Sequence, residues 1–166
     1  MVVRNGPLFS TTNLIHQPHF LRRGKHKEIA MECKYQPKTK EDLVNLCHDD
    51  SIYLGDIDTS LITDMSYVFM DSARKDYSGI ETWATSQVTD MHGMFERAKS
   101  FNQDISHWDV SKVKDMRMMF FGAENFNQDL KGWKLNSNVC RTNMFFNCPI
   151  EKKFKPVKHR EKSTAR

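Results

Sequence analysis

The three tryptophans of this chain recur at one fixed interval. Trp83, Trp108 and Trp133 lie 25 residues apart, inside segments that otherwise resemble one another. A chain that repeats in this way buries its core by stacking equivalent units. Side chains that recur therefore belong to the stack, and side chains that differ between units are free to bind.

Two neighbouring units, residues 84–108 and 109–133, match best. Both carry Val-x-Asp-Met-x-x-Met-Phe, followed by Phe-Asn-Gln-Asp and an aliphatic residue before the tryptophan. Residues 58–83 keep this pattern with one extra residue, which we place in a solvated loop at residues 72–76. Residues 139–150 keep only part of the pattern, and we interpret them as a degenerate half-repeat that closes the stack.

Each unit suggests two local structures. The apolar residues within 113–120 follow one helical face and predict a short helix or 3₁₀ turn. Ser111 or Asp115 would cap this helix, and Gly122 would close it at positive φ. Residues 105–110 mix β-forming and polar residues, which predicts a short strand with a bend.

Ahead of the repeats, residues 39–48 predict a capping helix, with Thr39 as N-cap and Asp42 three residues on. Together these elements predict an α/β fold, a short right-handed solenoid of about three 25-residue coils. Four segments follow from this interpretation: a disordered N-terminal segment at 1–32, the capping helix and a strand leading into the stack at 33–57, the repeat solenoid at 58–150, and a basic disordered tail at 151–166.

The net charge of +4 comes from the two ends of the chain, whereas the repeat body is mildly acidic. The positive charge is therefore weak evidence for a nucleic-acid groove. No apolar run is long enough to span a membrane. Residues 1–30 lack the features of a secretory signal, and one hypothesis is that Met31 is the natural start.

Neither a catalytic nor a metal-binding motif is visible. The sequence contains no nucleophile motif and no phosphate-binding glycine loop, so we expect neither an enzyme nor a cofactor. We expect buried thiols rather than a metal site, because the cysteines are too irregularly spaced for paired metal knuckles. These cysteines are Cys33, Cys47, Cys140 and Cys148.

Several recurring side chains have both a structural and a functional interpretation, and the structural one is favoured. The tryptophans could form a platform for sugars or bases, but burial of three such rings stabilises a short stack more. The recurring methionines and phenylalanines are assigned to the same core. The recurring aspartates could bind calcium, yet their polar neighbours indicate turn-closing side chains. These aspartates are Asp64, Asp90, Asp104, Asp115 and Asp129.

The candidate ligand face consists of residues that flank the tryptophans and differ between units. On the predicted strands, they would form adjacent rows. They are Glu81, Thr82, Ala84, Ser106, His107, Asp109, Lys131, Gly132 and Lys134. His92 and Arg117 also occupy a position that differs between units, and we assign His92 to the surface.

The repeat signature resembles that of the BspA-type leucine-rich-repeat surface proteins of bacteria, including the branch first described in mycoplasma lipoproteins. The segments that carry the resemblance are Val88-Thr89-Asp90-Met91, Met94-Phe95, Phe101-Asn102-Gln103-Asp104-Ile105, Trp108 and Asp109-Val110-Ser111. The resemblance implies a leucine-rich-repeat-like solenoid at the cell surface or secreted, without catalysis, that binds host matrix components or other cells.

We therefore expect a non-enzymatic protein-interaction module with a protein partner, from the host or a cell surface, and no small-molecule substrate. The oligomeric state is left open. The alternative is electrostatic binding to nucleic acid or anionic surfaces through the basic tail. Its cations are Lys152, Lys153, Lys155, Lys158, Arg160, Lys162 and Arg166.

Overall fold

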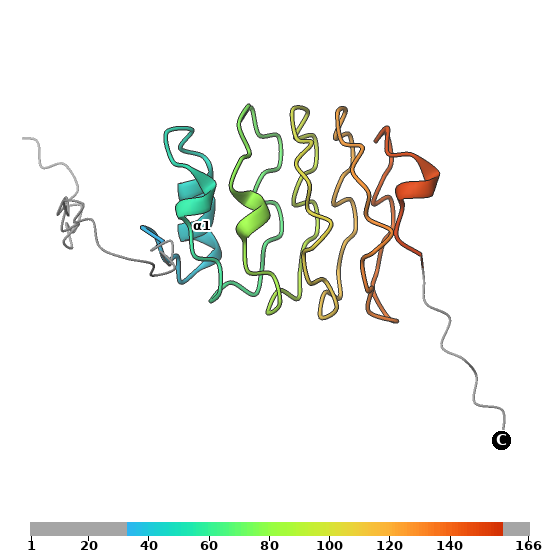
Figure 1. Ribbon diagram of the computed structural model, residues 1–166, viewed down its shortest axis with the longest axis horizontal. Coiled ribbons are helices and arrows are strands. Elements are labelled where there is room, and N and C mark those ends of the chain that lie inside the picture. Colours follow the sequence, from blue (N-terminus) through green and yellow to red (C-terminus); the bar gives the residue numbers. More distant parts are fainter. Residues whose placement is uncertain (1–32, 158–166) are drawn as a thin grey trace, which may run out of the picture. The chain divides into compact units, whose positions relative to one another are not determined.

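The computed structural model describes residues 33–157, which lie within the compact unit Met31–Arg166. The predicted segment 1–32 and the proposed start at Met31 lie outside the described residues. Successive repeat units lie side by side (Figure 1). The described residues form one α-helix, three 3₁₀ helices and isolated parallel bridges: α1 (Lys40–Cys47), η1 (Leu54–Asp56), η2 (Ile80–Thr82), η3 (Lys152–Phe154), and the bridges Tyr35–Ile57, Asp64–Asp90, Asp90–Asp115 and Asp115–Cys140.

The predicted fold class is wrong. An α/β leucine-rich-repeat-like solenoid needs a strand and a helical segment in each coil, and the described residues contain no sheet and only the one α-helix, α1. Residues 105–110 turn instead of extending, since the N–H of Trp108 donates to the carbonyl of Ile105 at 3.1 Å. This turn places both side chains in the core. No helix in the described part of the chain is long and apolar enough to cross a membrane.

The reason is that alternate backbone amides serve two purposes. In residues 91–98, one set of N–H groups closes local turns, as from Met94 to the carbonyl of Met91 at 3.3 Å. The N–H groups between them donate to the next unit, as from Gly93 to the carbonyl of Arg117 at 2.9 Å. A helix needs every amide to bond within its segment, and a strand needs none to close a tight local turn. Alternate use excludes both.

Two positions in each unit have the left-handed backbone that this alternation requires. Glycine or asparagine adopts it at little cost, but other residues occupy it here as well. The first column contains Tyr67, Gly93, Met118 and Asn143, with φ of 62°, 57°, 56° and 57°. The second contains Asp71, Arg97, Gly122 and Asn147, with φ of 55°, 53°, 65° and 53°. The positive φ predicted for Gly122 is confirmed, although no helix precedes it.

The predicted helix arose from a coincidence of spacing. Met91, Met94, Phe95 and Ala98 are all fully buried, and they stand at i, i+3, i+4 and i+7, which is one face of a helix. Overlapping turns that begin at every second residue bring the same four side chains to one side. The apolar pattern therefore correctly predicted which residues form the core and gave the wrong backbone conformation.

The core consists of aromatic columns that run through the stacked units. The rings of Trp83 and Trp108 are parallel within 1°, with centroids 6.5 Å apart. Each tryptophan Nε1 also donates to a carbonyl of the preceding unit: Trp83 to Leu54 at 2.9 Å, Trp108 to Ile80 at 3.2 Å and Trp133 to Ile105 at 3.0 Å. A second column contains Phe69, Phe95, Phe120 and Phe145, spaced 5.6, 5.6 and 5.5 Å apart. The prediction that the recurring aromatic and methionine side chains form the core is confirmed.

The helix predicted at 39–48 is also confirmed, as α1. The Thr39 side chain accepts from the N–H of Asp42, whose carboxylate accepts from the N–H of Thr39 in return. This reciprocal pair satisfies amides that a helix start leaves without partners. The apolar side of α1 is anchored by Leu43 and Cys47, which are fully buried.

The loop at residues 72–76 is not fully solvated as expected, because Arg74 is only 4% exposed. Its guanidinium donates to the carbonyls of Cys47 and Asp49, each at 3.1 Å, and to that of Ile52. Its Nε donates to the carbonyl of Asp76 at 2.6 Å. Arg74 thus joins the chain that follows α1 to the first repeat.

Trp108→Phe is expected to lower the free energy of unfolding by about 2–4 kcal/mol. The substitution removes one of the two donors to the carbonyl of Ile80, which also accepts from the N–H of Trp83, and leaves a gap in the core. Urea denaturation measures the loss, and the dependence of the free energy of unfolding on urea concentration should be unchanged. Lys99→Ala removes an exposed pair with Glu124 at 2.9 Å and should change stability by no more than about 0.5 kcal/mol. Equal stability of the two variants would contradict this role for the tryptophan column.

Arg74→Lys should cost about 2–4 kcal/mol, because an ammonium group cannot reach all of these carbonyls with the fork of a guanidinium. Thermal unfolding would detect the change as a lower Tm. The neighbouring Lys75, which is exposed and contacts Ser100 at 3.2 Å, offers the matched control Lys75→Ala. A loss as large in the control would show that the lower stability is not specific to the buried guanidinium of Arg74.

Candidate functional site

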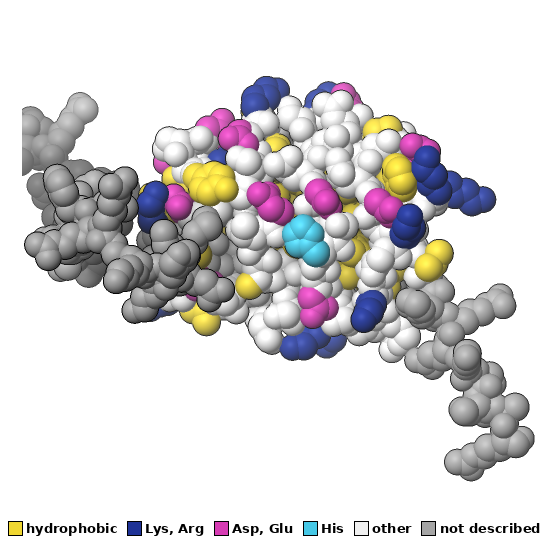
Figure 2. All heavy atoms as spheres, viewed as in Figure 1, with side chains coloured by type: hydrophobic (Ala, Val, Ile, Leu, Met, Phe, Trp, Pro, Cys, Tyr) yellow, Lys and Arg dark blue, Asp and Glu magenta, His cyan; other side chains and the backbone are white. Residues whose placement is uncertain are grey.

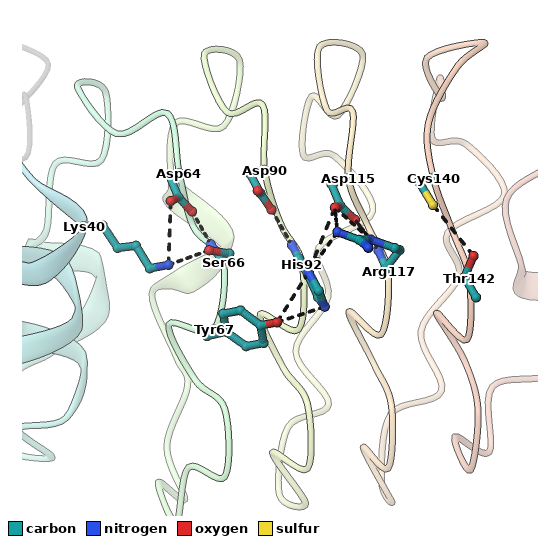
Figure 3. Close-up of polar contacts among 10 residues, drawn as sticks. All are labelled: Lys40, Asp64, Ser66, Tyr67, Asp90, His92, Asp115, Arg117, Cys140 and Thr142. Carbon is teal, nitrogen blue, oxygen red and sulfur yellow. Dashed lines mark hydrogen bonds and ion pairs between the residues drawn. The ribbon is translucent and has the colours of Figure 1, made fainter.

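A line of polar side chains crosses the repeat units where the parallel bridges join them. It contains Asp64, Asp90, Asp115 and Cys140 at the bridges, the residues two positions later, Ser66, His92, Arg117 and Thr142, and the flanking side chains of Lys40 and Tyr67 (Figure 3). We call this set the polar column. Figure 2 shows the face of the stack on which η2 and η3 lie in Figure 1, where acidic side chains form a row with a histidine beside them.

The three aspartates of the polar column have a structural role. The Oδ1 atom of each accepts from the backbone N–H two residues later: Asp64 from Ser66 at 2.7 Å, Asp90 from His92 at 2.8 Å and Asp115 from Arg117 at 2.9 Å. Asp104 and Asp129 accept in the same way from Ser106 and Lys131. The interpretation of the recurring aspartates as turn-closing residues is confirmed.

The residues two positions after Asp64, Asp90 and Asp115 differ in every unit, and side chains of the polar column interact across units. The hydroxyl of Tyr67 lies 3.0 Å from Nε2 of His92, and their ring centroids are 4.8 Å apart. Arg117 holds Asp115 at 2.6 Å, while Nδ1 of His92 lies 3.9 Å from the same carboxylate. Neighbouring units thus combine into one continuous polar surface.

The capping helix α1 contributes to this surface through Lys40. The ammonium group of Lys40 lies 2.5 Å from the hydroxyl of Ser66 and 3.6 Å from the carboxylate of Asp64. It also lies over the ring of Tyr67, 5.6 Å from the centroid. The aromatic ring of Tyr67 therefore stands between a lysine and a histidine.

Local charges are largely compensated within the polar column. Burial acts to raise the pKa of Asp115, but hydrogen bonds from the side chain and N–H of Arg117 outweigh it, so the pKa lies below its usual value. The hydrogen bond to Asp115 raises the pKa of Arg117 in turn. Both groups stay charged near neutral pH, and they form a fixed ion pair beside His92.

The structure brings together five of the residues predicted for the ligand face. Ser106, His107, Asp109, Gly132 and Lys134 line an open hollow of about 440 Å³, next to Trp108. They lie on turns and irregular segments rather than on the predicted strands. Their grouping is therefore a property of the stacked units, not of a sheet.

The other four predicted residues lie apart from that hollow. Thr82 and Ala84 line a second, smaller hollow of about 220 Å³ with residues of 55–59. Glu81 contributes its backbone carbonyl, 3.1 Å from Nε2 of His107. Lys131 pairs with Asp129 at 2.8 Å.

The cysteines do not behave alike. Cys47 is fully buried, and burial raises the pKa of its thiol, whereas Cys33 and Cys140 are exposed. The expectation of buried thiols is wrong for these two. Within residues 33–157, no group of three or more histidine, cysteine or acidic residues is placed to hold a metal ion.

Sequence reasoning did not identify the polar column as a surface. It recognised that His92 and Arg117 occupy one varying position, but it had no means of placing Lys40 and Tyr67 beside them. The available signal was the position two residues after Asp64, Asp90 and Asp115, which carries serine, histidine and arginine in turn.

The double variant Asp104→Asn, Asp109→Asn should make the stability less dependent on pH. Hydrogen bonds from the N–H and hydroxyl of Ser106, and from the hydroxyl and N–H of Ser111, lower the pKa of Asp104 and Asp109 from the usual 3.8. Their stabilisation is complete above that value and is lost as pH falls through the lower folded pKa. Tm measured from about pH 5 down to about pH 2 should fall less steeply in the variant than in the wild type. The asparagine side chains still accept the hydrogen bonds from Ser106 and Ser111, but they do not titrate. Parallel curves would contradict this assignment.

Comparison with known proteins places the chain in a family. The family model described as "Mycoplasma protein of unknown function, DUF285" matches residues 41–156, a span that includes nearly all of α1 and all the repeat units. Neither a curated protein nor a solved structure matches significantly. Because the match covers well over half of the chain, this protein belongs to the DUF285 family, a bacterial repeat family of unknown function.

Proposed function

We propose that the protein is a non-enzymatic protein-interaction module and that it binds its partner through the polar column. One observation carries this proposal: a repeated backbone frame holds unlike side chains at equivalent positions. Ser66, His92, Arg117 and Thr142 occupy the same place in four successive units. A surface of this kind changes its specificity by substitution without changing its fold.

The side chains of the polar column have the chemistry of binding hot spots. Tyrosine and arginine are enriched among residues that dominate interface energies, because each offers a large contact area and directed hydrogen bonds. Tyr67 is 38% exposed, and the side chain of Arg117 is 47% exposed. Both can contact a partner without rearrangement of the core.

The same side chains are held on an ordered backbone. The N–H of Tyr67 donates to the carbonyl of His92, and the N–H of Gly93 donates to that of Arg117, each at 2.9 Å. A surface that is ordered before binding loses less conformational entropy when its partner arrives. This favours recognition by the frame as it stands.

A catalytic alternative starts from the series Tyr67, His92 and Asp115, which has the order of a proton relay. In a relay, a carboxylate orients the histidine through a direct hydrogen bond. Asp115 lies 3.9 Å from His92 and is held instead by Arg117 at 2.6 Å. The ion pair satisfies the carboxylate, so we favour binding over catalysis.

The nature of the partner rests on the sequence resemblance to BspA-type surface proteins. That resemblance supports a protein of a host matrix or of another cell's surface. The coarser statement, membership of the DUF285 family, leaves the function open. We therefore assign adhesion as the proposed role and the polar column as its contact surface.

The proposal is tested with the full chain immobilised and probed with a panel of purified extracellular-matrix proteins. The triple variant Tyr67→Ala, His92→Ala, Arg117→Ala should weaken binding at least about tenfold at an unchanged Tm. A matched triple variant on the predicted ligand face is His107→Ala, Asp109→Ala, Lys134→Ala. Loss of binding only in the second variant would move the contact surface to the hollow beside Trp108.

Two further results would contradict the proposal. Turnover of any substrate that is abolished by His92→Ala would establish an enzyme. Binding that is lost on deletion of residues 158–166, and that weakens steeply with salt, would favour the basic tail and an anionic ligand. In the described part of that tail, Lys152 and Lys153 are exposed.

A further inference from the structure

Most backbone hydrogen bonds between repeat units run in one direction along the stack, and only one N–H per unit donates back to the preceding unit, as from Lys114 to the carbonyl of Thr89 at 2.8 Å. Four N–H groups of each unit donate forward to carbonyls of the next unit, over 2.7–3.0 Å. The pattern links residues 65–71 to 90–96, then 91–97 to 115–121, and finally 116–122 to 140–146. Each unit thus presents a row of carbonyls to its predecessor and a row of N–H groups to its successor.

The last unit has no successor among the described residues. Its carbonyls at 140, 142, 144 and 146 accept from the preceding unit. The N–H groups equivalent to the forward donors have no acceptor within residues 33–157; they belong to Arg141, Asn143, Phe145 and Asn147. We call this row the last edge. It lies on the final unit of the row in Figure 1.

The last edge keeps the backbone shape of the paired edges. Asn143 and Asn147 have φ of 57° and 53°, close to the 56° of Met118 and the 65° of Gly122 one unit earlier. Asparagine tolerates this left-handed conformation better than most residues. The four N–H groups are therefore already aligned for acceptors at alternate residues of a segment that folds in the same overlapping turns as the preceding units.

The surroundings of the last edge are basic and partly apolar. Arg141 occupies the position that holds the buried methionines Met91 and Met116 in earlier units. Lys155 lies over the ring of Phe145, 5.3 Å from its centroid. These residues line a hollow of about 460 Å³ with Phe146, which is 53% exposed, and the charged side chains in its lining are both cations.

We propose that the last edge binds an acidic segment of a partner protein, which continues the ladder in parallel orientation and takes up the same overlapping turns. Carbonyls at alternate residues of that segment accept from the N–H groups of Arg141, Asn143, Phe145 and Asn147. Its carboxylates face Arg141 and Lys155, and an apolar side chain packs on Phe146. Addition of a chain to an unpaired backbone edge is an established mode of peptide recognition.

Two occupants from this chain fit less well. The charged residues of segment 158–166 are four cations and one glutamate, and the cations would repel Arg141 and Lys155. A second copy would have to offer the carbonyls of its first repeat, at residues 64–70. That end is packed against α1, whose Lys40 contacts Ser66 at 2.5 Å and whose Leu43 and Cys47 are fully buried.

The test uses the full chain, labelled with ¹⁵N and titrated with a short peptide that alternates glutamate and valine. Saturable binding should slow hydrogen exchange at the amides of Arg141, Asn143, Phe145 and Asn147 at least about tenfold. Arg141→Glu, Lys155→Glu should weaken the affinity at least about tenfold. The matched control Lys99→Glu, an exposed cation elsewhere, should bind as the wild type does.

Three outcomes would overturn this proposal. A control peptide that alternates lysine and valine and binds as tightly as the glutamate–valine peptide would show that charge complementarity is not needed. An oligonucleotide binding more tightly than the peptide, without protection of these amides, would indicate electrostatic attraction alone. Protection of the four amides in the free protein would show that the last edge is already covered. The variant of Tyr67, His92 and Arg117 should leave peptide binding unchanged, which keeps this test separate from that of the polar column.

Discussion

The backbone ladder between equivalent residues of neighbouring units is the constraint on which the rest of the structure depends. Each unit gives alternate amides to its own turns and the amides between them to the next unit. This arrangement fixes the distance between units, and the phenylalanine rings then stack 5.5–5.6 Å apart. The aromatic columns and the ladder support one another, because a shift of one unit would break both.

The direction of the ladder makes its two ends unlike. At the first repeat, α1 and the buried guanidinium of Arg74 cover the stack. At the last repeat, N–H groups face outward beside Arg141 and Lys155. An end that presents aligned N–H groups attracts negative charge, for the same reason that the start of a helix does. The two ends are therefore suited to different tasks, one to capping and the other to recognition.

The frame also determines how the polar column is assembled. A Cβ at Gly93 would lie 2.6 Å from the ring of Tyr67, so the absence of a side chain there lets that ring lie against His92. Gly93 also has φ of 57°, and both requirements favour glycine. The contact between Tyr67 and His92 thus depends on a residue that contributes no functional group itself.

The sequence by itself determined the repeat length, the buried residues and the helix α1 with its Thr39 cap, because recurrence and apolar spacing report directly which side chains avoid water. It did not determine the backbone of the repeat, since overlapping turns and a helix bury the same positions. Nor did it bring Lys40, Tyr67, His92 and Arg117 together, or show that Ser106, His107 and Lys134 share a hollow while Thr82 and Ala84 do not. Those groupings depend on which carbonyl each amide reaches in the neighbouring unit, and only the tertiary structure decides that.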